Sequence, residues 1–175
     1  TRNHVRAVRG GVGEAKTMGN YAASLYAGEQ AHQHGYTQVL WLDGIERKYI
    51  EEVGAMNIFF VINGELITHM LTGSILPGVT RDTVLALERK GDIKVTERKI
   101  SIDEVFDAHK SGKLEEIFGS GTAAVISPVG EIKYGDTVIT VGKGSVGSMA
   151  NKFYKTISDI QYGNTEDPAG WIETL

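Results

Sequence analysis

Hydrophobic and polar positions follow two different periods along the 175-residue chain. Apolar residues at helical spacing, with capping residues at their ends, predict helices over 20–34, 79–91, 102–112 and part of 145–163. Short apolar or alternating runs bounded by turn residues predict strands over 38–43, 49–53, 58–62, 65–71, 94–101, 115–119, 123–132 and 137–141. The strands do not alternate regularly with helices. The pattern therefore predicts one mixed α/β (α+β) domain with a largely antiparallel or mixed, partly closed sheet.

Local signals mark the ends of several of these elements. Asn20 is a favourable N-cap for the first helix, and Gly35 stands where that helix should stop. Asn63-Gly64 lies between two apolar runs and is a strong signal for a tight hairpin. Thr80 can cap the second helix.

Composition constrains function more than fold. A net charge of −4 and a pI of about 5.7 provide no basic surface, so we expect no nucleic-acid partner. The chain has no cysteine, and its five histidines form no ligand constellation, so we expect no metal. No apolar run approaches the roughly 20 residues of a membrane helix, and we expect no membrane partner. The polar N-terminus lacks an initiator methionine, which favours a processed or truncated chain.

The segment GGVGEAKTMGNY (10–21) places Lys16 among glycines. A phosphate-binding P-loop would need a second glycine directly before the lysine, and Ala15 stands there. An ordinary solvated lysine is the simplest interpretation. The third interpretation is a lysine that forms a Schiff base, because glycines allow a ring to approach the backbone closely. Tyr21 would then be close enough in sequence to donate to a phenolic oxygen on that ring.

Two further segments are candidates for binding an anion. In SILPGVTRDT (74–83), Pro77-Gly78 leads into a helix whose first N–H groups, near Val79 and Thr80, favour a phosphate. In FGSGTAA (118–124), the glycines can turn consecutive N–H groups towards an oxyanion, and Thr122 adds a hydroxyl. An ordinary helix cap and an ordinary turn are the alternatives.

The strand-like run 49–53 carries an acid pair, Glu51-Glu52. Neighbours on a strand face opposite sides, so we expect one carboxylate in solvent and the other pointing inward. A buried carboxylate needs a cation or a strong donor, and a pyridinium N–H would serve. Two solvated glutamates at a sheet edge are the alternative.

Together these motifs resemble those of the branched-chain amino acid aminotransferases, which are pyridoxal-phosphate enzymes of fold type IV. The similarity covers nearly the whole chain. It is carried by GGVGEAKTMGNYAASL (10–25), QVLWLDG (38–44), EVGAMNIFF (52–60), GSILPGVTRD (73–82), FGSGTAAVISPVG (118–130) and IQYG followed by EDPAGW (160–171). The fold implied by the resemblance is a pseudo-barrel of mixed and antiparallel strands with flanking helices.

The resemblance implies roles around the ring of pyridoxal 5'-phosphate. Lys16 matches the lysine that forms the internal aldimine and shuttles the proton, and it is the expected catalytic residue. Tyr21 matches the partner of the ring oxygen. Glu52, and not Glu51, matches the ligand of the pyridine nitrogen. Leu76 matches the residue that packs on the ring.

The resemblance also implies how the phosphate and the substrate are bound. Val79 and Thr80 match the residues whose amides bind the phosphate. Thr122 matches a further phosphate ligand, and the turn Gly121-Thr122-Ala123 would also face the substrate carboxylate.

The implied activity is transfer of the amino group of leucine, isoleucine or valine to 2-oxoglutarate, by a cytoplasmic homodimer that acts on small amino acids and 2-oxo acids. Rival assignments are a D-amino acid aminotransferase, an aminodeoxychorismate lyase and a catalytically silent domain.

The sequence departs from the pattern of the family at three places. Ala55 replaces a residue that often carries a hydroxyl in the family, His69-Met70 replaces a common Pro-Pro, and no Cys-x-x-Cys follows Thr122. Residues 1–175 match the large C-terminal domain. The smaller N-terminal domain of the family, which supplies an arginine to the phosphate, has no counterpart here.

Overall fold

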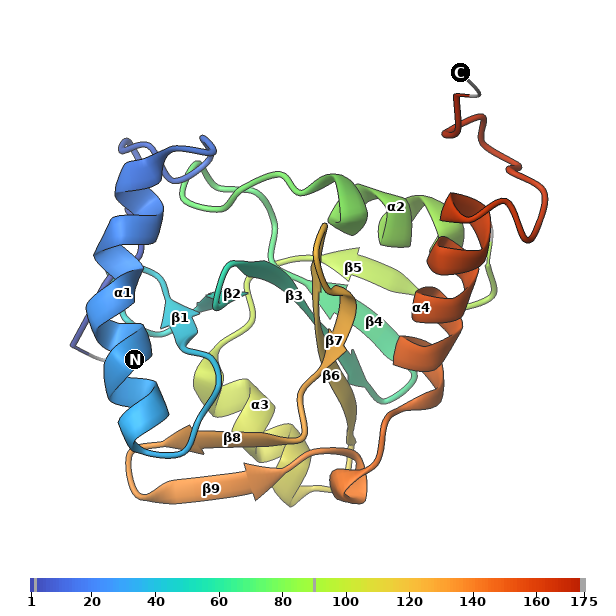
Figure 1. Cartoon of the computed structure of the whole chain (residues 1–175). Coiled ribbons are helices and arrows are strands. Elements are labelled where there is room, and N and C mark those ends of the chain that lie inside the picture. Colours follow the sequence, from blue (N-terminus) through green and yellow to red (C-terminus); the bar gives the residue numbers. More distant parts are fainter. Residues whose placement is uncertain (2, 90, 174–175) are drawn as a thin grey trace.

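A computed structural model describes residues 1, 3–89 and 91–173. Within these residues, seven strands form one sheet and two more form a separate hairpin, with four α-helices around them (Figure 1). The sheet consists of β1 (Leu40–Leu42), β2 (Ile50–Val53), β3 (Met56–Ile62), β4 (Glu65–Thr68), β5 (Val95–Glu97), β6 (Leu114–Gly121) and β7 (Val125–Pro128). The hairpin is β8 (Glu131–Tyr134) and β9 (Thr137–Thr140), followed by a short 3-10 turn, η1 (Gly142–Gly144). The helices are α1 (Met18–Gln33), α2 (Val79–Glu88), α3 (Ile102–Lys110) and α4 (Ser148–Gln161).

The long strand β3 organises the sheet. It pairs antiparallel with β2, β4 and β6, and β6 pairs in turn with β7. Only the β4–β5 pair is parallel among the strands that the structure describes. The predicted mixed α/β class is confirmed, with antiparallel pairing dominant.

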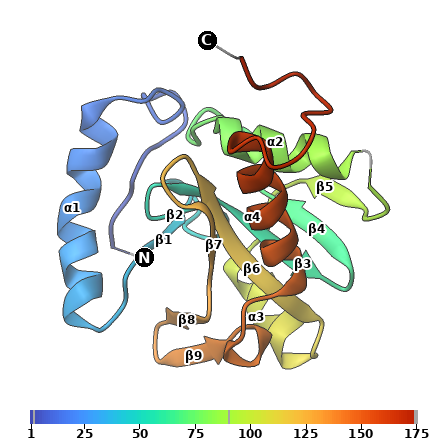
Figure 2. The same cartoon turned by 45° about the vertical axis from the view of Figure 1, so that its right-hand side comes forward.

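Successive residues of β3 point into two different cores. Ile58 and Phe60 belong to the cluster that α3 and the β8–β9 hairpin cover, whereas Phe59 and Val61 belong to the cluster under α2 and α4. This is the period of two that a strand imposes on its side chains. Figures 1 and 2 show α2 and α4 on one side of the sheet, α3 with the β8–β9 hairpin at its lower end, and α1 beside β1.

The turn between β2 and β3 determines which residues face each other near the site. Gly54 has φ +58°, a left-handed conformation that favours glycine. The indole Nε1 of buried Trp41 donates to the carbonyl of Gly54 at 2.9 Å and fixes the turn from the side of β1. Glu52 and Asn57 are therefore direct partners across the two strands.

Several predicted boundaries are wrong; for example, the predicted strand 94–101 contains only β5, and the predicted strand 65–71 ends at Thr68. The run 123–132 is not one strand: β7 ends at Pro128 and pairs with β6, and β8 begins at Glu131 and pairs with β9. The first helix begins at Met18 with Thr17 as its N-cap residue, so Asn20 is not the cap. In the part of the chain that the structure describes, no helix is both long and apolar enough to cross a membrane.

Candidate active site

Glu52 is a buried carboxylate at the centre of a polar cluster. Its residue is 3% exposed, and burial raises the pKa of its carboxyl to about 7, although the nearby charge of Arg6 lowers that pKa. Oε2 forms an ion pair with Nε of Arg6. From the residues that the structure describes, Oε1 accepts two long hydrogen bonds, one from the Leu76 amide at 3.2 Å and one from Asn57 Nδ2 at 3.4 Å. Oε1 therefore retains capacity to accept a bond from a further donor.

Glu51 is buried as well, at 7% exposure, so the expectation that one member of the acid pair lies in solvent is wrong. The two side chains leave β2 in opposite directions, but each meets protein. Glu51 Oε1 accepts a hydrogen bond from Ser74 Oγ at 2.5 Å. The segment before α2, which includes Ser74, packs on the side of β2 that would be exposed in an isolated strand. The alternation of residues along β2 could not predict that packing.

Arg6 connects three segments of the cluster, and sequence analysis missed it. Besides its ion pair with Glu52, its Nη2 donates to the carbonyl of Ser74 at 2.8 Å and to the carbonyl of Gly13 at 3.2 Å. A Cβ on Gly13 would lie 2.4 Å from the Ser74 carbonyl oxygen, so a glycine is needed where these segments meet. The charged run before the glycine-rich loop was the only sequence signal, and it did not reveal a partner.

Lys16 is exposed at the end of the glycine-rich loop, just before α1. The loop is held from behind by Asn20, which is buried and whose Nδ2 donates to the carbonyls of Val12 at 2.8 Å and Ala15 at 2.9 Å. Asn20 thus anchors the backbone that presents Lys16, a role different from the predicted capping role.

A small cavity brings several predicted residues together. Tyr21, Glu52 and Leu76 line it, with Ala55 and Arg6 among the other lining residues. Its volume is about 10 Å³, roughly the space for one water, so an aromatic ring would lie over its mouth rather than inside it. Tyr21 is 38% exposed and is available to such a ring, whereas Lys16 does not line the cavity itself.

The start of α2 is joined to Glu52 through Asn57. Asn57 Nδ2 donates to the Leu76 carbonyl at 2.8 Å, and a Cβ on Gly78 would lie 2.2 Å from Asn57 Oδ1. Gly78, and not the predicted Thr80, is the N-cap residue of α2, and it provides no side-chain cap. The first N–H groups of a helix have no partner within the helix, so the amides of Val79 and Thr80 can bind an anion.

The turn after β6 lies at the same side of the molecule. Ser120 pairs with Asn57 across β6 and β3, which places Gly121, Thr122 and Ala123 just beyond the asparagine that contacts the start of α2. Thr122 and Ala123 are exposed. Figures 1 and 2 agree that this turn, the segment leading to α2 and the glycine-rich loop lie along one upper side.

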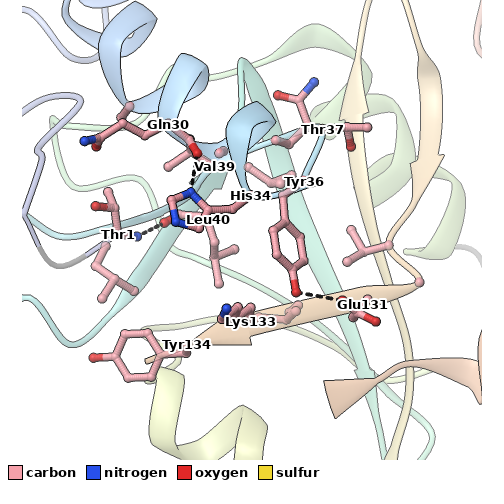
Figure 3. Close-up of a pocket in the computed structure, with 18 of the residues that line it drawn as sticks. Thr1, Gln30, His34, Tyr36, Thr37, Val39, Leu40, Glu131, Lys133 and Tyr134 are labelled. Carbon is pink, nitrogen blue, oxygen red and sulfur yellow. Dashed lines mark hydrogen bonds between the residues drawn. The ribbon is translucent and has the colours of Figure 1, made fainter. Parts of the chain in front are cut away.

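A larger cavity of about 360 Å³ lies elsewhere, between α1 and the β8 strand (Figure 3). A hydrogen bond of 2.7 Å from the Tyr36 hydroxyl to Glu131 crosses it. It contains none of the predicted site residues, and among the described residues no group of His, Cys, Asp or Glu could hold a metal ion. The candidate site is therefore identified by the functional groups around Glu52 and not by the size of a cavity.

Comparisons with known proteins identify the family of the chain. The family profile "Amino-transferase class IV" matches residues 2–132. Branched-chain-amino-acid aminotransferase 2 of Bacillus subtilis is 60% identical over 167 residues, which cover 95% of this chain and 46% of that protein. A probable branched-chain-amino-acid aminotransferase of Streptomyces coelicolor is 45% identical over 175 residues, or 100% of this chain and 48% of that protein.

Solved structures are similar over the same extent. The branched-chain amino acid aminotransferase of Escherichia coli superposes with a TM-score of 0.84 at 34% identity, covering 98% of this chain and 53% of that one. The T.th. branched-chain amino acid aminotransferase, complexed with N-(5'-phosphopyridoxyl)-L-glutamate, gives a TM-score of 0.77 at 29% identity, covering 92% and 50%. The chain spans about half the length of the relatives it matches. The extent of the family match and of these identities shows that the chain belongs to the class IV aminotransferases, with the type IV fold.

Proposed function

We propose that residues 1–175 form the cofactor-bearing large domain of a pyridoxal-phosphate-dependent branched-chain aminotransferase. The donors would be leucine, isoleucine and valine, and the acceptor 2-oxoglutarate. The names of the relatives support the substrate class. The solved T.th. structures with a phosphopyridoxyl glutamate and with pyridoxamine 5'-phosphate support the cofactor. The observation that carries the proposal is the buried Glu52 carboxylate, which has one oxygen available and is linked through Asn57 to a helix start that suits a phosphate.

The residues present fit the cofactor. Glu52 Oε1 would accept a hydrogen bond from a protonated ring nitrogen, and Tyr21 would donate to the ring oxygen. Leu76 would pack on the ring, since it lines the same small cavity as these two side chains. When bound, pyridoxal phosphate supplies the electron sink that stabilises negative charge on the substrate Cα.

Binding of the phosphate and of the substrate would involve the two neighbouring backbone segments. The amides of Val79 and Thr80 and the hydroxyl of Thr122 would hold the phosphate, where the positive end of the α2 dipole favours an anion. The turn Gly121-Thr122-Ala123 would orient the substrate carboxylate through its N–H groups. Val79 and Thr122 are both exposed, so neither segment must be displaced to admit a ligand.

Lys16 would move the proton. Its Nζ would take the proton from the Cα of the bound amino acid as a general base and return a proton as a general acid, the two roles that transamination needs. The glycine-rich loop leaves this side chain free of packing, while Asn20 holds the backbone behind it.

We also propose that the protein acts in the cytoplasm as a homodimer. Support for association comes from α1, on which Met18, Leu25 and Tyr26 are more than half exposed. Apolar side chains gathered on one helix favour burial against another protein surface.

The test is a titration of the chain with pyridoxal phosphate, followed by visible absorbance, for wild type, Glu52→Gln and the control Glu29→Gln. Glu29 is exposed on α1, and its Oε1 accepts a hydrogen bond from Gln33 Nε2 of the same helix. We expect saturable binding with a new absorption band, weakened at least tenfold by Glu52→Gln and unchanged by Glu29→Gln. Absence of binding would refute the proposal. A transamination assay of the protein in its longest native form, with leucine against D-alanine as donor, separates the L-specific activity from the D-specific rival.

A further inference from the structure

Beside the proposed site lies a second buried carboxylate, that of Glu51, which the proposed reaction does not use. Ser74, which is 2% exposed, donates its hydroxyl proton to Glu51 Oε1 at 2.5 Å. Thr72 Oγ1 lies 3.2 Å from Ser74 Oγ and can donate to it, because the hydroxyl proton of Ser74 is already engaged. Glu51 is therefore held in one position by a short chain of hydroxyl groups.

Ser74 links the carboxylate of Glu51 to the carboxylate of Glu52 in the proposed site. Its carbonyl oxygen accepts the bond from Arg6 Nη2 at 2.8 Å, and Nε of the same guanidinium pairs with Glu52. One residue thus contacts Glu51 through its side chain and Arg6 through its backbone. Displacing Ser74 would therefore move the Arg6 guanidinium, which forms the ion pair with Glu52.

The charges in this cluster do not balance. The charged groups that act on Glu51 are Asp43, Arg6 and Lys99, and those that act on Glu52 are Arg6 and Glu51. Lys99 is about half exposed and pairs with Glu46, and Asp43 accepts backbone N–H bonds from its own turn. Among the described residues, the buried cluster therefore contains one guanidinium for two carboxyls. Burial raises the pKa of both carboxyls, because uncompensated negative charge in a buried place is costly unless a cation arrives.

We propose that Glu51 is a positioning residue that acts through Arg6: its negative charge offsets part of the Arg6 charge, so that Glu52 still favours a protonated ring nitrogen. This inference rests on the proposed function. Without Glu51, Arg6 and Glu52 would neutralise each other, and the site would have less preference for a cationic ring. The electron sink is stronger when the ring nitrogen is protonated, so Glu51 would affect turnover without touching the cofactor.

The experiment measures the ring nitrogen directly. The protein in its longest native form is loaded with pyridoxal phosphate that carries ¹⁵N in the ring, and the ¹⁵N shift is followed from pH 6 upward until the ring nitrogen of each protein has lost its proton. Wild type, Glu51→Gln, Glu51→Asp, Ser74→Ala and the control Glu29→Gln are compared. Circular dichroism of each variant without cofactor checks folding first.

We expect the ring nitrogen of wild type to stay protonated up to at least pH 9. In Glu51→Gln its deprotonation should move down by about one pH unit, with kcat falling about tenfold and KM for leucine changing less than threefold. Glu51→Asp, which keeps the charge, should behave like wild type, and Ser74→Ala should shift in the same direction as Glu51→Gln. A merely structural role for Glu51 would lower the melting temperature and leave the ¹⁵N titration unmoved.

Two outcomes separate this inference from the proposed function. Failure of wild type to bind the cofactor refutes the proposed function. Normal binding and turnover by wild type, with a Glu51→Gln titration that overlays it, overturns the inference alone. If Glu51→Gln does not fold, the Ser74→Ala titration decides: a curve identical to wild type overturns the inference, and a downward shift supports it.

Discussion

The guanidinium of Arg6 and the carboxylate of Glu52 form an ion pair with side chains that are only 10% and 4% exposed. The pair joins the segment ahead of the glycine-rich loop to β2. A buried pair of this kind adds little over an apolar pair of the same volume, but breaking it leaves a buried charge without a partner. The site therefore depends strongly on both members being present.

Replacing Arg6 with alanine should destabilise the cofactor-free protein by about 3–5 kcal/mol. The variant loses the ion pair and the two carbonyl bonds to Gly13 and Ser74. Urea denaturation followed by circular dichroism measures the change. Arg89→Ala, at the exposed end of α2, is the matched control and should stay within about 0.5 kcal/mol of wild type. Similar losses in the two variants would contradict the role given to Arg6.

The stability of the cofactor-free protein should depend on pH through Glu52. Its folded pKa of about 7 lies above the ordinary value of 4.5, so the protonated form is favoured by folding. The resulting stabilisation is complete below about pH 4.5 and is lost as the pH rises through 7. Relative to Glu52→Gln, wild type should lose on the order of 3 kcal/mol between pH 4.5 and pH 8. A difference between the two proteins that stays constant with pH would show that burial does not shift this carboxyl.

Lys16 should be the residue that becomes covalently attached to the cofactor. Borohydride reduction in the presence of pyridoxal phosphate, followed by peptide mapping, should place the adduct on Lys16. Lys48 serves as the internal control, because it lies in the segment between β1 and β2 and does not line the cavity next to Glu52. An adduct mainly on Lys48, or a Lys16→Arg variant labelled to the same extent as wild type, would contradict the assignment.

Glu116 should stabilise α4 from a distant strand. Its carboxylate accepts the amides of Met149 and Ala150, each at 2.9 Å, at the start of the helix. Glu116→Ala should cost about 1–2 kcal/mol in the free energy of unfolding, since it removes both the cap and a favourable charge at the helix N-terminus. Thermal denaturation is the measurement, and Glu29→Gln is the control. An unchanged midpoint for Glu116→Ala would show that the cap contributes nothing.

This 175-residue chain alone should have little transaminase activity. Lys16, Val79 and Thr122 are exposed at the candidate site, and the cavity next to Glu52 is far too small to enclose a substrate. Water in an open site weakens electrostatic stabilisation, and an unheld substrate loses the advantage of orientation, which can amount to several kcal/mol. The assay compares the chain with a form that also contains the other half found in its relatives, using leucine and 2-oxoglutarate. Rates within tenfold of each other would refute the need for that half.

The fold class and most elements could be predicted because the signals were local. The Asn63-Gly64 hairpin and the alternation along β3 depend only on neighbouring residues, and the structure contains both. The break between β7 and β8 could not be predicted from the apolar run 123–132, because it depends on which strand each half pairs with.

The candidate site was predicted only where a motif marked it. Tyr21, Glu52 and Leu76 were named from the sequence, and the structure places them around one cavity. Arg6 and Ser74 were missed because their importance arises from contacts between residues far apart in the chain. Asn20 was assigned a local role as a cap, but it turns back to bind the loop before it.

The bond between Trp41 and Gly54 gives the protein an internal optical reporter. The chain has two tryptophans, and Trp171 is 41% exposed in the segment after α4, whereas Trp41 is 1% exposed and pairs with Glu52 across β1 and β2. The two indoles should therefore emit at different wavelengths, with the blue-shifted component coming from Trp41. A chromophore bound at Glu52 would quench that component selectively by energy transfer, so occupancy could be read from native fluorescence without any label.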